Sequence, residues 1–558
     1  MELLFAHRDD GSPILGHEAD AATAASQARS IPPRPSREEP FLADITAGAS
    51  DLTSQRWAVV VPAGAEGARL AALVQGLVRA RAEEQAAEVL SIEVPPGLDR
   101  EAATAWKAQI YPALYGEDEQ RRPRYLLILG DLDQVSLDTQ LVLAQDGLPG
   151  RLACASDDGY QAYVDKVLAW QRRPSEHDRA RALFYTVQDG TPATAAGHAK
   201  LIQPCHERCA RTARDRPRAF PASVIEAHGA QVPDPDELRA LAAGRHPSVL
   251  LSMSHGLGPP RRRPWSPAEA RLHQGAMSFG AEGALEAADV ASGPFLPGGL
   301  WIYFACFGAG TPRTSAYHHW LDMLERHGMA DLGPVNATLR GLDQHGGFVS
   351  GLAKAALGNP EGPLAVLGHV DLAWSYGYEE LSVDRAGAVP RVVGSNRSLN
   401  FFHLMTKLVA GERAGAASLA LRLPLDAVSA RLTAHYDRCQ REGTPLGAVP
   451  ADALALGNLW MLHQDLLGYV LLGDPAVQLP LARGAAAVRR PADVDAGALD
   501  RLERAALAVA GGQSPGVVAL ELGVARSEVT EAAEIYREAG RAALATLLAR
   551  RAPEKGRT

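Results

Sequence analysis

The chain has 558 residues, 46% of them hydrophobic and 22% charged, and a formal net charge of −9 at pH 7. This length predicts several domains or subdomains with ample core, and the composition is typical of a soluble globular protein. The negative charge argues against generic nucleic-acid binding, five cysteines are too few for a disulfide scaffold of this size, and no apolar run approaches the ~18 residues that span a bilayer.

The N-terminal stretch predicts neither export nor a fixed fold. The first ten residues lack the basic start and the extended apolar core of a secretory signal, so we expect a cytoplasmic protein with reduced thiols. Residues 1–50 are rich in Ala, Pro, Ser and charge, which predicts a loosely ordered N-terminal arm.

Strand and helix patterns alternate from Trp57 onward. The first set comprises strands at 57–61, 89–94 and 125–131 and helices at 67–87, 102–114 and 157–170. The second set comprises strands at 181–187, 223–228, 248–253, 300–305, 363–369 and 468–473, helices at 194–214 and 235–243, and a helical region over 399–465. Such alternation predicts an α/β fold with a parallel sheet and helices on its faces. We expect a small α/β subdomain over 51–175, a second subdomain over 176–482 and a helical module over 484–558.

Two of these strands end in side chains suited to catalysis. One apolar run leads into Cys306, within the sequence Ala-Cys-Phe-Gly, and another leads into His255, which is followed by Gly256. In the caspase pattern a histidine lies about 50 residues before a cysteine in an Ala-Cys-x-Gly context. Here the separation is 51 residues, and we interpret His255 and Cys306 as a Cys/His catalytic dyad at the ends of neighbouring parallel strands. The alternative for Cys306 alone is a buried structural thiol.

Seven motifs in order resemble the gingipain-like cysteine peptidases of the caspase–haemoglobinase clan, a bacterial, caspase-like family. The resemblance covers roughly residues 57–482. Its landmarks lie at 127–131, 150–156, 182–190, 254–256, 305–306, 364–368 with Trp374, and 472–475. It implies that residues 176–482 form a caspase-like catalytic subdomain and that the smaller α/β subdomain precedes it.

The resemblance also implies roles for residues around the dyad. Asp189 corresponds to an acid that orients the histidine, although an aspartate before a glycine is also an ordinary turn residue. The backbone N–H groups of Gly256 and Cys306 would form an oxyanion hole, because a residue without a side chain allows close approach to a substrate carbonyl.

A third strand, at 364–368, implies the substrate-binding region. There the resemblance implies that Trp374 walls the primary specificity pocket, with Asp371 and Ser375 beside it as further substrate-binding residues. The alternative for Trp374 is core packing.

One departure concerns specificity. Family members that cut after arginine carry a pocket aspartate about eleven residues beyond the orienting acid, and here that position falls near Lys200 or Leu201. Specificity for a basic residue therefore cannot be transferred to this chain.

Three further motifs have less specific interpretations. Cys205 and Cys209 flank a histidine, and His435 precedes Cys439, but neither pattern has standard zinc-ligand spacing, so we expect no metal and no cofactor. Residues 261–263, three consecutive arginines, favour a solvated loop over attraction of acidic substrate or a self-cleavage site.

The C-terminal module contains a helix–Gly turn–helix spacing at 517–529. Residues 490–558 carry ten basic and ten acidic residues, so the module has no net positive charge to attract the phosphates of a nucleic acid. We therefore favour a protein-interaction or packing module over DNA binding.

The sequence as a whole favours a cytoplasmic cysteine endopeptidase that cleaves a specific protein partner through an acyl-enzyme. Regulation by an activator that binds the N-terminal arm or the C-terminal helices is expected, and nucleic-acid or membrane partners are not. Two alternatives remain: a catalytically silent caspase-like interaction scaffold, and a DNA-linked regulator that uses the C-terminal helices.

Overall fold

The computed structural model describes residues 3–15, 48–115, 121–173, 175–229, 233–326, 331–375, 378–384, 391–443, 450–482, 502, 504–506, 508–509, 514–522 and 529–530. These residues fall in two compact units. One contains residues 3–15 and 56–482, and the other contains residues 48–55 and the described residues beyond 500. The subdomain boundary expected near residue 175 stays a prediction, and a single sheet extends on both sides of it.

A ten-stranded sheet, ordered β3-β2-β4-β5-β18-β15-β12-β8-β6-β7, organises the larger unit. The predicted α/β fold with a largely parallel sheet is confirmed. The strand bounds are β2 Trp57–Pro62, β3 Leu90–Val94, β4 Tyr125–Leu129, β5 Leu148–Leu152, β6 Ala180–Thr186, β7 Ala222–His228, β8 Ser248–Met253, β12 Leu300–Phe304, β15 Ala365–His369 and β18 Tyr469–Gly473. The eight strands between the two edge strands β3 and β7 are buried at almost every position, which agrees with a sheet that is covered on both faces.

The sheet contains one antiparallel junction that the alternating pattern did not predict. Strand β18 pairs parallel with β5 but antiparallel with β15, so the first five and the last five strands of the order run in opposite directions. Asp474, which follows β18, is buried and accepts hydrogen bonds from Trp57 Nε1 at 2.9 Å and from Arg81 Nη2 at 2.7 Å. This carboxylate ties the end of β18 to β2 and to the helix Gln75–Gln85.

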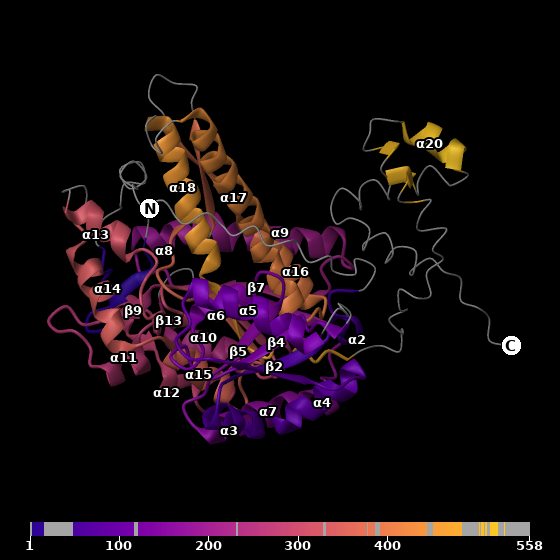
Figure 1. Cartoon of the computed structure of the whole chain (residues 1–558), viewed down its shortest axis with the longest axis horizontal. Coiled ribbons are helices and arrows are strands. Elements are labelled where there is room, and N and C mark those ends of the chain that lie inside the picture. Colours follow the sequence, from indigo (N-terminus) through magenta and orange to yellow (C-terminus); the bar gives the residue numbers. More distant parts are fainter. Residues whose placement is uncertain are drawn as a thin grey trace. The chain divides into compact units, whose positions relative to one another are not determined.

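Helices cover both faces of the sheet. Around β2 and β4, Figure 1 shows α3, α4 and α7 on one side and α5 and α6 on the other. The helix bounds in the larger unit are α3 Ala65–Leu73, α4 Gln75–Gln85, α5 Arg100–Tyr115, α6 Leu137–Leu143, α7 Asp157–Arg172, α8 Pro192–Gly197, α9 Gln203–Asp215, α10 Pro235–Ala242, α11 Pro267–His273, α12 Ala287–Val290, α13 His318–Arg326, α14 Gly333–His345, α15 Gly351–Gly358, α16 Ser398–Val409, α17 Ala414–Glu442 and α18 Pro450–Leu467. The helix expected over 67–87 is two helices, because the buried Val74 leaves the helical conformation with φ −102° and ψ 13°.

Shorter strands build three small sheets beside the main one. Their pairing orders are β1-β9-β10-β11, β13-β14 and β16-β17. The bounds are β1 Phe5–His7, β9 Gly256–Gly258, β10 Met277–Ser278, β11 Ala284–Leu285, β13 Gly310–Thr311, β14 Phe348–Val349, β16 Glu379–Asp384 and β17 Arg391–Asn396.

Residues 3–15 differ from the expectation of a loose arm. Strand β1 pairs in parallel with β9, and Leu3, Leu4, Phe5 and Ala6 are all buried. Their apolar side chains gain burial here, which offsets the conformational entropy lost on ordering. Residues 16–47 of the predicted arm lie outside the described residues.

The smaller unit is helical where it is described. It contains α2 Leu52–Gln55 and α20 Pro515–Leu522, and Ala505, Val518, Ala519 and Val529 form a buried cluster. Residues 523–528 of the predicted helix–Gly turn–helix, which include the turn glycine, lie outside the described residues, so the structure does not test that prediction.

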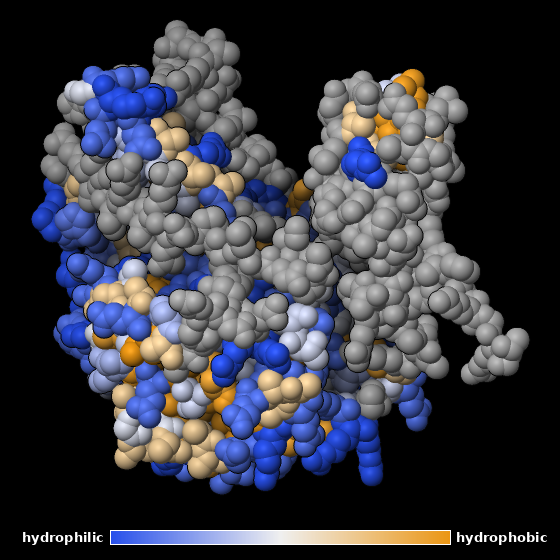
Figure 2. Space-filling model, turned by 45° about the vertical axis from the view of Figure 1, so that its right-hand side comes forward, coloured by the Kyte–Doolittle hydropathy of each residue, from blue (hydrophilic) through white to orange (hydrophobic). Residues whose placement is uncertain are grey.

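The described surface offers little extended apolar area. Leu272, Leu399 and Val517 are the large hydrophobic side chains with high exposure among the described residues. On the face that Figure 2 presents, hydrophobic residues are interspersed with hydrophilic ones. Within the described part of the chain, no helix combines the length and apolar character that crossing a bilayer requires.

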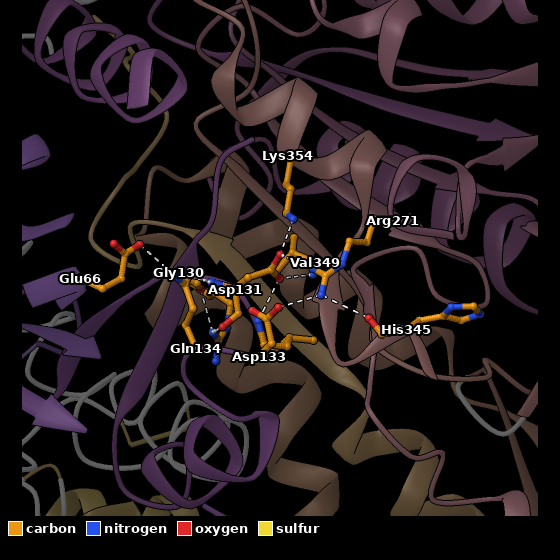
Figure 3. A network of polar contacts seen from close by, with 11 residues as sticks. Glu66, Gly130, Asp131, Asp133, Gln134, Arg271, His345, Val349 and Lys354 are labelled. Carbon is orange, nitrogen blue, oxygen red and sulfur yellow. Dashed lines mark hydrogen bonds and ion pairs between the residues drawn. The ribbon is translucent and has the colours of Figure 1, made fainter. Parts of the chain in front are cut away.

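Asp131 lies at the centre of a polar network that connects the end of β4 to the segment around β14 (Figure 3). Its carboxylate accepts a hydrogen bond from the N–H of Val349 at 2.5 Å and forms ion pairs with Lys354 and with Arg271. Strand β14 pairs with β13, which begins four residues after Cys306. The network therefore supports the chain that leaves the predicted nucleophile.

Replacing Asp131 with alanine is expected to destabilise the larger unit by about 3 kcal/mol, because Lys354 and the buried backbone N–H of Val349 lose their contact with the carboxylate and Arg271 loses one of its two carboxylate partners. The matched control is Asp133→Ala, which removes a neighbouring carboxylate that is 43% exposed and pairs with the same arginine, Arg271. An exposed pair of that kind contributes about 1 kcal/mol or less. Chemical denaturation of both variants measures the difference, and equal losses would contradict the role assigned to Asp131.

Candidate active site

Three adjacent parallel strands deliver the three predicted catalytic side chains. In the β6-β8-β12 part of the sheet, Met253 is aligned with Thr186 on one side and with Phe304 on the other. Asp189 follows β6 by three residues, and His255 and Cys306 follow β8 and β12 by two residues each. The prediction that the histidine and cysteine strands are parallel neighbours is confirmed.

His255 is held through its Nε2 atom. This atom lies 2.9 Å from Thr191 Oγ1 and 3.8 Å from Asp189 Oδ2. The Thr191 hydroxyl donates to Asp189 Oδ1 at 2.8 Å and therefore accepts from His255, which assigns the proton of the neutral imidazole to Nε2. The other ring nitrogen, Nδ1, is buried without a hydrogen-bond partner and keeps a free lone pair.

Asp189 combines the two roles that its sequence context allowed. Its Oδ1 accepts hydrogen bonds from the N–H of Thr191 at 3.1 Å and from Thr194 Oγ1 at 2.7 Å, which forms the turn before α8. Its Oδ2 has no hydrogen-bond partner and faces His255. Burial lowers the pKa of His255 below its ordinary value, while the Asp189 carboxylate and the backbone of Leu3 act in the opposite direction.

Cys306 is fully buried and contacts the backbone of Ala373. Its Sγ accepts a hydrogen bond from the N–H of Ala373 at 3.2 Å and lies 3.6 Å from the carbonyl oxygen of the same residue. Burial raises the pKa of the Cys306 thiol well above its ordinary value, although the hydrogen bond from Ala373 opposes this. The side chain is therefore a neutral thiol in this arrangement.

The two predicted oxyanion-hole donors point at the same oxygen atom. The N–H groups of Gly256 and Cys306 donate to the carbonyl of Leu4, at 2.7 Å and 3.1 Å. A Cβ atom on Gly256 would lie 1.9 Å from the carbonyl oxygen of Cys306, so only glycine allows the two backbones to approach this closely.

The three predicted substrate-binding residues are buried next to this pair. The backbone of Trp374 forms an antiparallel bridge with Leu3, and its indole packs edge-on against Tyr317 with ring centroids 5.9 Å apart. Asp371 has φ 108°, and its carboxylate accepts from Ser315 Oγ at 2.7 Å and from the N–H of Ala316 at 2.9 Å. Ser375 is 5% exposed. The Asp371 carboxylate thus accepts hydrogen bonds from the protein itself, and the backbone of Trp374 pairs with the N-terminal segment at Leu3.

The remaining motifs lie away from this constellation of groups. Cys205 and Cys209 are buried in α9, and no three His, Cys, Asp or Glu side chains of the described residues gather as a metal site would need. Arg261 pairs with Asp10 at 3.3 Å, and Arg263 pairs with Glu269. Lys200, one of the two residues near the position of the pocket aspartate considered from the resemblance, pairs with Glu379 at 2.8 Å.

Sequence reasoning missed three residues of the site. Thr191 is signalled only by the Thr-Pro start of a helix two residues after Asp189, a common N-terminal pattern of helices. Ala373 acts through its backbone, and no side-chain pattern marks it. Leu4 belongs to the segment that we expected to be loosely ordered.

Comparisons with known proteins give similarities to solved protease structures alone. No family model matches the chain, and neither does any curated protein. A chain described as a protease shares 12% identity and a TM-score of 0.43, with 76% of this chain and 78% of that chain covered. The Arg-specific cysteine proteinase gingipain R shares 11% identity at a TM-score of 0.41, with 76% of this chain and 78% of that chain covered. A complex of the pro- and mature domains of Porphyromonas gingivalis RgpB shares 13% identity at a TM-score of 0.40, with 76% of this chain and 79% of that chain covered. At these values the case for a function rests on the geometry of the site.

Alkylation of Cys306 by iodoacetamide is expected to be slow at pH 7 and to rise about tenfold per pH unit up to at least pH 9. The sign follows from the raised pKa, because the thiolate is the reactive form and its fraction grows with pH until the pKa is passed. Peptide-level mass spectrometry measures the rate, with glutathione as the reference thiol, whose rate levels off near its pKa of ~8.5. A rate for Cys306 that is constant above pH 7 would contradict the neutral thiol.

Proposed function

We propose that this protein is a cysteine endopeptidase in which Cys306 is the nucleophile and His255 the general base and acid. A single observation supports it most strongly. Three neighbouring strand ends hold an acid, a histidine and a cysteine, while two backbone N–H groups at the same place bind one carbonyl oxygen. Nucleophile, base, orienting acid and oxyanion donors together define acyl transfer through a thioester.

In the proposed mechanism, Cys306 Sγ attacks the carbonyl carbon of the scissile bond while its proton passes to Nδ1 of His255. A C–S bond forms, and the oxyanion accepts hydrogen bonds from the N–H groups of Gly256 and Cys306. The C–N bond then breaks, and His255 returns the proton to the leaving amine. Water then attacks the thioester carbonyl and gives a proton to His255. The C–S bond breaks, and His255 returns the proton to the sulfur, which releases the carboxylic acid and restores the free thiol.

Asp189 and Thr191 act as positioning residues in this mechanism. The Thr191 hydroxyl fixes the proton on Nε2, which leaves Nδ1 as the basic nitrogen. The Asp189 carboxylate, at 3.8 Å, favours the imidazolium that forms when the thiol is deprotonated.

We propose a protein substrate inside the cell. All five cysteines are free, and they include Cys205 and Cys209, which lie one helical turn apart in α9. Free thiols in this number favour a reducing compartment. A regulated endopeptidase in such a compartment needs its site covered until it is required.

Activity-based labelling tests the proposal. The purified chain is treated with a panel of acyl-oxymethylketones that carry different residues next to the reactive group, beside Cys306→Ala, His255→Ala and Cys439→Ala. Cys439 is a matched control because it is also buried and lies 3.8 Å from a histidine nitrogen, in His435. We expect labelling that requires Cys306 and His255 but not Cys439. Labelling that persists in Cys306→Ala, or that His255→Ala leaves unchanged, would favour the scaffold alternative.

A further inference from the structure

The carbonyl in the predicted oxyanion hole belongs to the chain itself. Residues 3–15 lead through the site, and the oxygen of Leu4 takes hydrogen bonds from both donors, Gly256 and Cys306. A scissile carbonyl occupies this position in acyl transfer, because the donors are aimed at the oxygen that becomes negative. The peptide bond between Leu4 and Phe5 is thus held where a substrate bond would be.

The segment also has extended pairing on both sides of that bond. Leu3 pairs antiparallel with Trp374, and Phe5 to His7 pair in parallel with β9 directly after His255. Extended peptides are commonly recognised through such backbone pairing, with pockets for the side chains giving specificity. The backbone of Leu3 is near enough to His255 to influence the pKa of its imidazole.

The side chains of the segment fit apolar surroundings. Leu3, Leu4 and Phe5 are 2%, 0% and 0% exposed. The ring of Phe5 meets Phe307 edge to face with centroids 5.1 Å apart, and a Cβ on Gly258 would come within 2.4 Å of Phe5 Cζ. A glycine on β9 therefore leaves the space for an aromatic ring immediately after the bond.

Charged contacts further along hold the segment in place. Arg8 pairs with Glu286 at 3.0 Å, and Asp10 pairs with Arg261 at 3.3 Å. Residues 7–12 form a turn closed by the N–H of His7, which donates to the carbonyl of Ser12 at 2.8 Å. These anchors lie outside the dyad, so they can be altered without changing the catalytic groups.

We propose that the site accepts leucine or a similarly sized apolar residue immediately before the scissile bond, and that residues 3–5 occupy it as an intramolecular competitor. This inference rests on the proposed function. The proposed preference for an apolar residue differs from specificity for a basic residue. The Asp371 carboxylate already accepts hydrogen bonds from Ser315 and Ala316 and is therefore not free to bind a basic side chain. The strongest competing interpretation concerns Asp465, a buried carboxyl group that binds the N–H of Trp374 and could attract an arginine.

The experiment compares full-length wild type with the double variant Arg8→Glu/Asp10→Lys, in which both anchors become like-charge pairs. The control is Arg245→Glu/Asp138→Lys, which reverses one residue in each of two surface ion pairs, with Glu361 and Arg100, and changes the net charge by the same amount. Each protein is treated with acyl-oxymethylketones that carry leucine, arginine or aspartate next to the reactive group. Mass spectrometry gives the rate of Cys306 modification.

We expect the leucine probe to react at least ~10-fold faster than the other two. We also expect faster labelling of the anchor variant than of wild type or the control. A faster reaction with arginine or aspartate, or equal rates in the anchor variant and wild type, would overturn the inference while Cys306-dependent labelling kept the proposed function intact. If iodoacetamide modifies Cys306 in the anchor variant but none of the probes does, both the inference and the proposed function fail.

Discussion

Replacing Cys306 with alanine is expected to abolish peptide hydrolysis, with a loss in kcat/KM on the order of 10⁴-fold or more. In the proposed mechanism the acyl-enzyme forms on Cys306 alone, because His255 Nδ1 is assigned the role of base and the Gly256 N–H that of oxyanion donor. The fold should be retained, because the replacement removes one sulfur atom whose contacts are with the backbone of Ala373. Hydrolysis of a cleavable peptide by the anchor variant Arg8→Glu/Asp10→Lys, with and without the substitution, measures the effect.

The control for this prediction is Cys439→Ala. This residue is buried in α17 and has a histidine neighbour, yet it lies on a helix far along the chain from the three strand ends. Its replacement should leave kcat/KM within about twofold of the parent, in line with a substitution that touches no reacting group. Comparable losses for Cys306 and Cys439 would indicate a general effect on folding instead of chemistry.

Replacing Gly256 with alanine is expected to reduce kcat/KM by roughly 10²–10³-fold, the effect of losing one oxyanion-hole donor. The new Cβ would lie 1.9 Å from the carbonyl oxygen and 2.9 Å from the carbonyl carbon of Cys306. These are backbone atoms, so the ends of β8 and β12 must separate and the two N–H groups no longer converge. Thermal unfolding should also occur at a lower temperature, because both strands lie in the core of the sheet.

Gly341→Ala is the matched control for Gly256→Ala. Gly341 lies inside α14, and the nearest atom to its added Cβ is His345 Nε2 at 3.9 Å. Alanine is favoured over glycine in a helix interior by up to ~1 kcal/mol, so this variant should be as stable as the parent or slightly more stable. Full activity in Gly256→Ala would rule out the convergent oxyanion donors.

The main features of the site could be predicted because they are local in sequence. An apolar run that stops at a reactive side chain and a glycine predicts a buried strand that ends in a candidate functional group, as at His255 and Cys306, and the structure confirms both strands. Parallel pairing then brings such ends to one edge of the sheet. Asp189 was ambiguous from sequence, and the structure explains why: one carboxylate oxygen forms the turn and the other faces the histidine.

Other features depend on partners that are distant in the chain. The antiparallel junction between β15 and β18 joins residues about a hundred positions apart, and the apolar runs do not encode strand direction. The ordering of residues 3–6 depends on pairing with β9, whose sequence Gly-Leu-Gly has no strand-like hydrophobic pattern. A Leu-Leu-Phe run beside a polar, proline-rich stretch carries no local sign that its backbone pairs with the candidate site.

If the proposed function holds, the neutral, buried Cys306 and the occupied donor pair describe the closed state of the enzyme. While the carbonyl of Leu4 accepts from both N–H donors, Cys306 is fully buried, and burial keeps the pKa of the thiol high. Departure of residues 3–5 would expose the thiol and lower this desolvation penalty. A partner that draws the N-terminal segment away would therefore open the site and activate the nucleophile in one step.

The most direct test of the central claim is a cleavage map. The anchor variant Arg8→Glu/Asp10→Lys is incubated with a mixture of peptides from denatured proteins, and new peptide ends are identified by mass spectrometry, beside the same protein carrying Cys306→Ala. We predict new C-termini that end predominantly in leucine or another large apolar residue and that disappear with Cys306→Ala. An absence of new ends in the anchor variant, or the same ends in the alanine variant, would contradict a peptidase built on Cys306.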